Sequence, residues 1–285
     1  MRGRLIGVLA LGIAAIAVPA VTHAAYPGKN GKLAVEGDTR PGIWTVKPNG
    51  SDLTRITSKR GLPFAPSWSP NGNWIAFAQS NALRKMRPDG SHKVTLVKGV
   101  TSDIATKISW SPDGRRLVFS KKSDLWTVNR NGEDAKRITK TPDAEEMPSW
   151  SPKGGRIAFQ FRDDVTADVD LRLIKPNGTG EVPVPNTKNG RKPDWAPNGK
   201  RLAYAAPGVG INLIKPDGSG QTTFAKQQGN KFVTDPAWSP DGAQIAYSRN
   251  VSLSRTQIIR KGVSGGKEHI VVKRKHWFNP SWQPR

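Results

Sequence analysis

The side chains in this 285-residue chain that could do chemistry are few. It has no cysteine and four histidines, and three of these, His92, His269 and His276, lie beyond the first two dozen residues. Without cysteine there is no thiolate nucleophile, no thiolate metal ligand, no disulfide and no lipidated cysteine. His92 follows a turn signal and His276 stands beside Trp277, so surface or packing roles are expected. This inventory predicts no catalytic residue and no metal site built on histidine or cysteine.

One stretch has the spacing of a serine nucleophile. Gly262–Gly266 reads G-x-S-x-G, which in hydrolases places a reactive serine on a sharp turn between a strand and a helix. Here a short β-type run lies on each side of the motif, and an earlier copy of the same segment reads Pro-Asp-Gly-Ser-Gly at 216–220. Ser264 is therefore predicted to be a residue of a hairpin turn.

Carboxylates gather at one place in an otherwise basic chain. They are Asp163, Asp164, Asp168 and Asp170. Oxygen ligands at such alternating positions suit Ca²⁺, although the spacing matches no defined calcium loop. Two interpretations are compatible with this pattern: a calcium site between Asp163 and Asp170, or an acidic loop exposed to solvent. Glu145 and Glu146 are expected to lie across the same face.

All of these residues are embedded in a repeat. A tryptophan is followed two residues later by proline at six places, Trp68, Trp110, Trp150, Trp195, Trp238 and Trp282, at intervals of 42, 40, 45, 43 and 44 residues. A period near forty accommodates one small sheet per repeat and is typical of a propeller or a repeat array.

Two glycine turns divide each repeat into four short strands, A to D. After Trp110, which marks strand A, the β-type runs are 117–120, 125–128 and 136–139. The first turn reads Ser-Pro-Asp-Gly, in which proline presets φ and glycine permits the last position. No segment beyond the apolar N-terminus sustains a helical period, so the chain is predicted to be all-β.

The two ends of the repeat region are complementary. The segment 30–35 matches strand B without a strand A before it, whereas 279–282 matches strand A without a strand B after it. Pairing the two removes both exposed edges, which would otherwise invite aggregation. The sequence therefore predicts a six-bladed propeller of four-stranded blades, closed by the C-terminal strand on the N-terminal blade.

The repeat resembles that of the TolB-type, WD-like β-propeller family. The resemblance is carried by the pattern Pro-Ser-Trp-Ser-Pro-Asp-Gly, followed by strands such as 116–120 and 125–128, and it covers 28–285. It implies the propeller alone, without the N-terminal α/β domain which that family adds. Similar repeats form the non-catalytic propeller of prolyl-oligopeptidase-like enzymes and the body of some oligouronide lyases.

The N-terminus has the features of a secretory signal. Arg2 and Arg4 precede an apolar run over 5–18, and Thr22-His23-Ala24 provides a small-residue cleavage site. We expect a signal peptide at 1–24 and a mature propeller at 25–285, secreted or periplasmic and without a transmembrane segment. A retained N-terminal anchor is the alternative, although the run is short for a membrane span.

The net charge points to anionic partners. The chain carries 45 Lys and Arg against 22 Asp and Glu, a formal charge of +23, and +21 once Arg2 and Arg4 are removed. Such a surplus attracts polyanions and accelerates encounter with them. The alternative is a basic surface that is simply solvated. No nucleic-acid-binding motif is present, so no sequence-specific nucleic-acid partner is predicted.

The antiparallel order of the strands predicts where recognition takes place. The A–B and C–D turns lie at one end of the disc, and the irregular B–C and D–A connections lie at the other. Variable loops on a rigid scaffold commonly carry binding residues, and the channel mouth is the default site. The predicted ligand-binding residues are Lys107, Glu145, Glu146, Arg191, Lys192, Asp235 and Asn279.

Two function classes follow from these observations. The favoured one is a monomeric, non-enzymatic binding scaffold outside the cytoplasm, for a protein partner or an acidic polysaccharide or cell-wall polymer. The alternative is a carbohydrate-active propeller enzyme, such as a lyase on uronate polymers. A lyase needs a base beside neutralising cations, or a metal, gathered at one mouth. Convergence of such groups in the folded chain would discriminate between the two.

Overall fold

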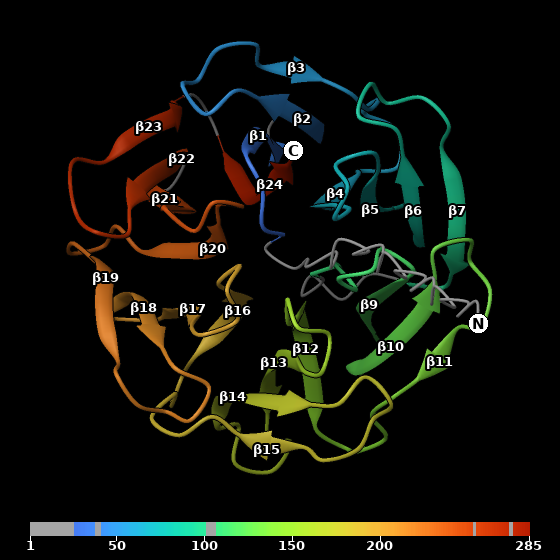
Figure 1. Cartoon of the computed structure of the whole chain (residues 1–285), viewed down its shortest axis with the longest axis vertical. Helices are drawn as coiled ribbons and strands as arrows, with labels where there is room; N and C mark the ends of the chain where they lie inside the picture. Colours follow the sequence, from blue (N-terminus) through green and yellow to red (C-terminus); the bar gives the residue numbers. More distant parts are fainter. Residues whose placement is uncertain (1–25, 38–40, 101–106, 253–254, 274–275) are drawn as a thin grey trace, which may run out of the picture.

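Six four-stranded antiparallel sheets surround a central axis in the computed structural model (Figure 1). The structure describes residues 26–37, 41–100, 107–252, 255–273 and 276–285. The all-β prediction and the six-bladed propeller are thereby confirmed. The predicted signal peptide at 1–24 lies outside the described residues. Within the described ranges, no helical segment has the length and hydropathy needed to span a bilayer.

The blades are numbered from the one that joins the two ends of the chain, and their strands run from the axis outward. Blade 1 consists of β24 (Trp277–Pro284), β1 (Asn30–Gly37), β2 (Gly42–Val46) and β3 (Thr54–Arg55). Blade 2 consists of β4 (Phe64–Trp68), β5 (Ile75–Gln79), β6 (Ala82–Met86) and β7 (Val94–Lys98). Blade 3 consists of β8 (Ser109–Trp110), β9 (Arg116–Lys121), β10 (Asp124–Asn129) and β11 (Lys136–Arg137).

The other half of the ring has the same order. Blade 4 consists of β12 (Ala144–Trp150), β13 (Ile157–Arg162), β14 (Val169–Ile174) and β15 (Val182–Pro183). Blade 5 consists of β16 (Arg191–Trp195), β17 (Leu202–Ala206), β18 (Gly210–Ile214) and β19 (Thr222–Lys226). Blade 6 consists of β20 (Val233–Trp238), β21 (Gln244–Ser252), β22 (Arg255–Gly262) and β23 (His269–Val272).

The C-terminal strand closes the ring. β24 pairs antiparallel with β1, with Leu33 opposite Trp282. The backbones of Lys29 and Arg285 exchange two hydrogen bonds at 2.9 and 3.0 Å. Because β24 supplies the innermost strand that blade 1 lacks, the predicted pairing of the two half-repeats is confirmed.

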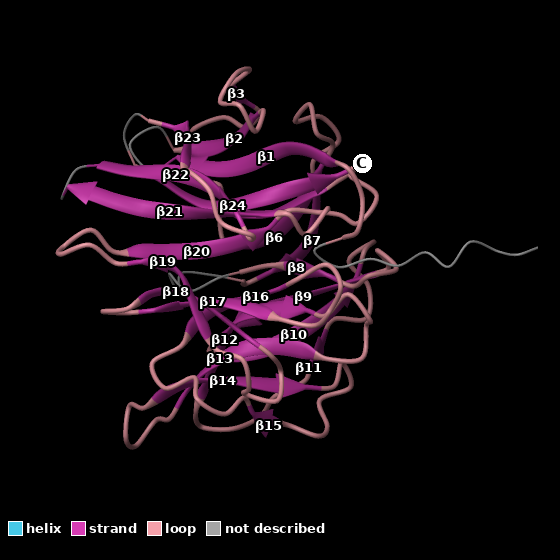
Figure 2. Ribbon diagram, turned by 60° about the vertical axis from the view of Figure 1, so that its left-hand side comes forward, coloured by secondary structure: helices cyan, strands magenta, loops and turns pink. Residues whose placement is uncertain are grey.

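The two ends of the disc differ in the kind of turn they carry. The A–B and C–D turns lie at one end, here called the hairpin face, together with the C-terminus. The B–C and D–A connections lie at the opposite end, here called the mouth face. Figure 2 shows β21 and β22 extending toward the mouth face on the left and the C-terminus on the right. The chain order therefore separates uniform turns from irregular loops, as predicted.

The repeat tryptophans are buried between blades, and neighbouring blades are joined at the same level. At four of the six junctions, the side chain before one tryptophan accepts a hydrogen bond from the backbone N–H of the tryptophan of the following blade. Ser281 accepts from Trp68 at 3.2 Å, Ser109 accepts from Trp150 at 3.0 Å, and Asp194 accepts from Trp238 at 2.9 Å.

At the other two junctions, the indole N–H of Trp110 and of Trp282 bonds the carbonyl oxygen of Ser67 and of Ala237. Buried tryptophan rings therefore repeat around the axis. The hydrogen bonds beside them fix the position of each blade relative to its neighbour.

The C–D hairpins place a glycine against the outer strand region of the preceding blade. Gly90 adopts φ of +85°, and a Cβ built there would lie 2.1 Å from the carbonyl oxygen of Ile56. Both the left-handed backbone and the close approach require glycine. The same closeness recurs at Gly178, against Ile138, so this contact is part of how blades pack.

Gly90→Ala is expected to lower the free energy of unfolding by about 2–5 kcal/mol, because left-handed strain and overpacking add together. Gly208→Ala is the matched control, since Gly208 has φ of +80° but no neighbour within 4 Å of the added Cβ. It should cost only the strain of about 1–2 kcal/mol. Urea unfolding of both variants measures the difference. Equal losses would show that the contact with the preceding blade contributes nothing.

Candidate functional site

The innermost strands line a central channel, and the segment that begins at Tyr26 lies at its hairpin end. Tyr26 lines the channel, is almost fully buried, and donates its hydroxyl hydrogen bond to the carbonyl oxygen of Trp110 at 3.0 Å. Gly28 N–H bonds the carbonyl oxygen of Pro240, which holds this segment at the turn end of blade 6. Burial raises the pKa of Tyr26 well above its usual value, so its hydroxyl stays protonated. The remaining space for water-sized molecules is about 90 Å³.

The side chains at the open end come from one repeated position, three residues before the tryptophan. Those residues are Ala65, Lys107, Met147, Lys192, Asp235 and Asn279, and all six line the channel. In β4, β16 and β20 the pairing with the next strand shifts at this point, which is a β-bulge. Lys192 and Asp235 both have φ of +54°, in the left-handed region. The bulge directs the side chain into the channel, a common use of bulges beside binding sites.

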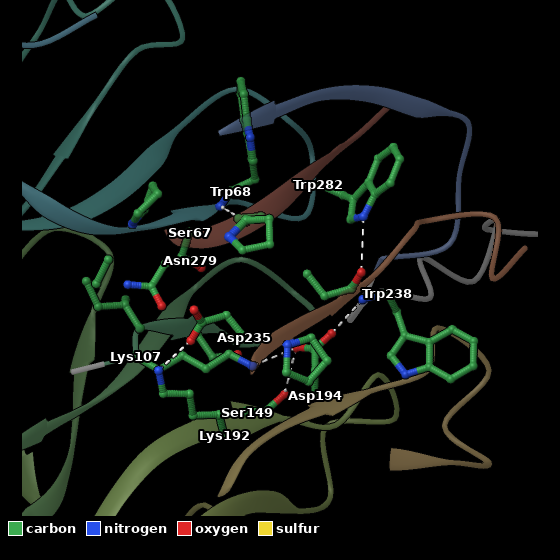
Figure 3. A pocket seen from close by; sticks show the side chains of 18 of the residues that line it. Ser67, Trp68, Lys107, Ser149, Lys192, Asp194, Asp235, Trp238, Asn279 and Trp282 are labelled. Atoms are coloured by element: carbon green, nitrogen blue, oxygen red, sulfur yellow. Dashed lines mark hydrogen bonds and ion pairs between the residues drawn. The ribbon is translucent and has the colours of Figure 1, made fainter. Parts of the chain in front are cut away.

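Two lysines at this open end are paired with carboxylates. Lys107 Nζ lies 2.8 Å from Asp194 Oδ1 and also bonds the carbonyl oxygen of Pro193 at 2.6 Å. Lys192 Nζ lies 2.5 Å from Asp235 Oδ1. Figure 3 shows these four side chains directed toward one another across the channel. The positive charges predicted at the mouth are therefore present but neutralised within the site.

Asp194 connects three blades. It takes the place that serine has before the tryptophan of blades 2, 3 and 4, and its Oδ2 accepts the backbone N–H of Trp238. Its Oδ1 is the partner of Lys107 in blade 3. Because removing Asp194 would leave a buried N–H without its acceptor and Lys107 without its opposite charge, its first role is structural.

Glu36 completes the polar ring. It lies on β1, and its Oε2 accepts from Asn279 Nδ2 at 2.7 Å and from Ala65 N–H at 3.1 Å. Burial raises the pKa of Glu36; Asp235 also raises it, whereas the two hydrogen bonds and Lys192 lower it. Asp235 is itself buried, and its Oδ2 has no hydrogen-bond partner among the described residues. The mouth thus holds partly compensated buried charge.

The seven residues predicted to bind ligand divide into two groups. Lys107, Lys192, Asp235 and Asn279 line the channel. Glu145, Glu146 and Arg191 do not. For all seven residues, a role in ligand binding stays a prediction.

Glu145 is fully buried toward blade 3. Its backbone N–H bonds the carbonyl oxygen of Ser123 at 2.7 Å, and its carboxylate accepts from the Thr141 hydroxyl. Burial raises the pKa of Glu145, while the hydrogen bond from Thr141 lowers it. Glu146 is half-buried, and Arg191 is exposed at the start of β16. Glu146 and Arg191 each stand one residue before a channel-lining position, and adjacent residues of a strand point to opposite sides. Glu145 stands one residue further back, ahead of the register shift that β12 makes between Glu146 and Ser149.

The sequence did not point to Glu36 or Asp194. Glu36 lies on the second strand, whereas the prediction drew only on residues ahead of the first. Asp194 could have been found, because it stands where other repeats have serine. Aligning the six repeats reveals this carboxylate, because it stands at a position where the other repeats have serine or alanine.

In the acidic loop of blade 4, aspartate side chains accept hydrogen bonds from backbone N–H groups. Asp163 Oδ1 accepts the N–H of Val165 and of Thr166, and these bonds hold the pKa of Asp163 below its usual value. Asp164 N–H bonds Asp143 Oδ1. Among the described residues, no three His, Cys, Asp or Glu side chains converge as metal ligands. A calcium site between Asp163 and Asp170 stays a prediction.

The other candidate groups lie away from the channel. Ser264 lies in the turn between β22 and β23, where Gly265 N–H bonds the carbonyl oxygen of Gly262 at 3.2 Å. His92 and His269 lie on hairpin turns or outer strands, and His276 stacks on Phe278 with ring centroids 6.2 Å apart. Among the described residues no histidine lines the channel.

A closed ring of six four-stranded blades around a central channel defines a six-bladed β-propeller. The chain belongs to the TolB β-propeller domain family, whose model matches residues 37–230. This confirms the resemblance found in the repeats.

Relatives of known name match over short stretches. The Tol-Pal system protein TolB of Nitratidesulfovibrio vulgaris is 42% identical over 43 residues, which are 15% of this chain and 10% of that protein. The protein of the same name in Anaeromyxobacter dehalogenans is 29% identical over 125 residues, or 38% of this chain and 26% of that one. The matched stretches span about a quarter or less of these relatives.

Solved structures share the fold at low identity. TolB from Acinetobacter baumannii superposes with a TM-score of 0.73 at 16% identity, covering 90% of this chain and 67% of that one. An oligogalacturonate lyase in complex with manganese superposes with a TM-score of 0.57 at 12% identity, covering 86% and 74%. Likeness at this identity shows the propeller fold alone.

Glu36→Gln is expected to raise the melting temperature at pH 7, because the amide retains an acceptor for Asn279 and Ala65 without a buried charge. The folded pKa of Glu36 is raised above its ordinary value of 4.5, so the cost of its charge is fully present above the folded pKa. That cost is lost as the pH falls through the folded pKa, and it is gone below 4.5, where the folded and unfolded forms are both protonated. Calorimetry of both proteins between pH 7 and 4 checks this. A gap in melting temperature that widens toward pH 4 would contradict it.

Proposed function

We propose that this chain is a non-enzymatic binding propeller that acts outside the cytoplasm and receives a segment of a protein partner at its mouth face. The observation that carries the proposal is the distribution of exposed apolar side chains. Among the residues that the structure describes, the four most exposed large apolar side chains are Leu62, Val165, Val209 and Phe232, with exposed fractions of 65, 93, 47 and 50%. All four lie on B–C or D–A connections around the mouth.

Apolar side chains held out on loops are typical of protein-binding surfaces. The channel beside them offers polar groups whose charges are already paired, through Lys107 with Asp194 and Lys192 with Asp235. Because these charges are already paired, a partner gains little by neutralising them. A partner that contributes apolar contacts and backbone hydrogen bonds is favoured instead. Membership of the TolB propeller family supports a binding role, and the N-terminal features of a secretory signal support a location outside the cytoplasm.

An acidic polymer is the second candidate, and the formal charge of +23 favours it. Exposed cations such as Arg191 and Lys231 lie on the mouth-face connections. Binding through them would weaken with salt, since exposed charges are screened beyond about 8 Å at physiological ionic strength.

The alternative of a uronate-polymer lyase has less support. A lyase requires a base poised beside the substrate and cations free to neutralise it. In the channel both lysines are already bonded to carboxylates. The likeness to the oligogalacturonate lyase is a likeness of fold.

Photo-crosslinking in the native cell tests the proposal. A photoreactive residue at Leu62 or Phe232 is expected to trap one protein partner, which mass spectrometry identifies. With that purified partner, Leu62→Asp and Phe232→Asp should each weaken binding about tenfold or more, the loss typical of a hot spot. Leu53→Asp and Ile270→Asp are the controls, because these side chains are 39 and 40% exposed but lie near the hairpin turns and the outer rim.

Unchanged affinity in both mouth variants would overturn the protein-binding proposal. Binding of polygalacturonate that falls with salt and with Arg191→Glu, yet ignores Leu62→Asp, would favour the acidic polymer instead. Ser264→Ala should leave binding unaltered, because Ser264 lies in a turn of the hairpin face.

A further inference from the structure

The seam between blades 2 and 3 brings three cations together at the hairpin face. Lys85 lies on β6, Arg87 directly follows that strand, and Arg130 lies in the turn between β10 and β11. Lys85 Nζ donates a hydrogen bond to the carbonyl oxygen of Arg130 at 2.5 Å, which joins the two blades. Lys85 is half-buried, whereas the side chains of Arg87 and Arg130 are exposed. The three cations are therefore accessible from solvent.

The indole ring of Trp74 holds two of these cations in place. Lys85 Nζ lies 4.6 Å from the centroid of the ring, and the guanidinium carbon of Arg87 lies 4.2 Å from the same centroid. Both distances are within the range of cation–π attraction. Because an indole has no net charge, the ring fixes the cations without neutralising them. A guanidinium stacked on a ring also keeps N–H groups at its edge for other acceptors.

No carboxylate compensates this positive charge. Among the residues that the structure describes, none of the three cations forms an ion pair. Burial lowers the pKa of Lys85, and the charges of Arg130 and Arg87 lower it further. The three cations therefore repel one another, and a bound anion would relieve that repulsion.

Blade 6 has a cation at the same place without such a concentration of charge. The strand register places Arg260 of blade 6 where blade 2 has Lys85. Arg260 bonds the carbonyl oxygen of Pro48 at 2.8 Å and Gln244 Oε1 at 2.7 Å. These acceptors belong to neutral residues that satisfy the guanidinium, so the position itself does not require an anion.

Departures from the repeat assemble the cluster in blades 2 and 3. Trp74 stands where blade 6 has Gln244 and where blades 3, 4 and 5 have arginine. Arg130 stands in its turn where four other blades have proline. Lys85 stands where blades 1 and 3 have threonine and blades 4 and 5 have leucine. Because three departures meet at one seam, the cluster is not a by-product of the repeat.

A phosphate group matches these donors in kind and in charge. The planar fork of arginine binds phosphate through two parallel hydrogen bonds, and lysine binds it as a point charge. A phosphate monoester carries about two negative charges at pH 7, so it compensates more of the cluster than a single carboxylate does.

We propose that the seam of blades 2 and 3 binds a phosphate monoester group at the hairpin face. Arg87 and Arg130 donate N–H groups to the phosphate oxygens, and Lys85 Nζ makes the third contact. The site lies at the end of the disc opposite the mouth face. It is therefore independent of the protein-binding proposal.

Side-chain NMR during titration with inorganic phosphate, at constant ionic strength, tests the proposal. Saturable shifts are expected at the Nε–H groups of Arg87 and Arg130 and at the indole N–H of Trp74, while Arg191 on the mouth face stays unmoved. Acetate, which carries one charge, should bind at least tenfold more weakly. Displacement of phosphate by glycerol 3-phosphate would identify a soluble ester as the source of the group, and displacement by phosphatidylcholine vesicles only when they contain phosphatidate would identify a lipid head group.

Variants borrowed from other blades provide the matched controls. Arg87→Asn introduces the residue that blade 3 has at this position and should weaken phosphate about tenfold, the loss expected for one charge-assisted hydrogen bond. Lys215→Asn makes the same replacement at the matching position of blade 5, where the neighbouring carboxylate is Asp217, and should leave affinity unchanged. Lys85→Thr should also weaken phosphate about tenfold, while the melting temperature holds or rises because the repulsion is relieved.

Four outcomes would overturn the site. They are shifts that do not saturate or that appear equally at Arg191, equal affinity for acetate and phosphate, equal losses from Arg87→Asn and Lys215→Asn, and displacement by neither ester. Because Arg87 is exposed, its variant keeps the test decisive even if Lys85→Thr does not fold. Phe232→Asp should leave phosphate binding intact, which separates this test from that of the mouth.

Discussion

The ring depends on one short contact that recurs at four of its six blade junctions, the hydrogen bond from the tryptophan backbone N–H of one blade to the side chain before the tryptophan of the preceding blade. Ser281 makes it to Trp68 across the closure, so the seam between the chain ends is built like an interior junction. Each such bond fixes the height and rotation of a blade relative to its neighbour. Since the channel is lined by residues next to these tryptophans, the same contact also fixes the geometry of the mouth.

The fold could be predicted from the sequence because its determinants repeat. Each repeat carries its own signals, which are a Trp-x-Pro motif at a period near forty and two glycine turns. Because these signals recur and the two half-repeats are complementary, all of them indicate the same fold. The site is less predictable because it depends on departures from the repeat. Lys107 and Lys192 were expected as available cations, but pairing with Asp194 and Asp235 is a property of three-dimensional neighbours from other blades. Glu146 and Arg191 do not line the channel because one step along a strand reverses the direction of a side chain, which a list of residues ahead of each tryptophan does not resolve.

Repetition with local exceptions also explains where function can reside. A symmetrical ring would have a uniform channel and six equally filled blade interfaces. Here Asp194 stands where four other blades have serine, and the position three residues before the tryptophan differs from blade to blade, with two lysines, an aspartate and an asparagine among its six residues. Each exception sits on a scaffold held by its unaltered neighbours, so a blade tolerates a buried charge that a small isolated sheet would not.

Tyr26 gives the channel a direction. Its ring is buried at the hairpin end of the channel, and its hydroxyl is bonded to Trp110. A partner that enters from the mouth face therefore meets irregular loops first and an aromatic ring last. The space left between them is about 90 Å³, so a narrow group such as the tip of a loop fits where a broad surface does not.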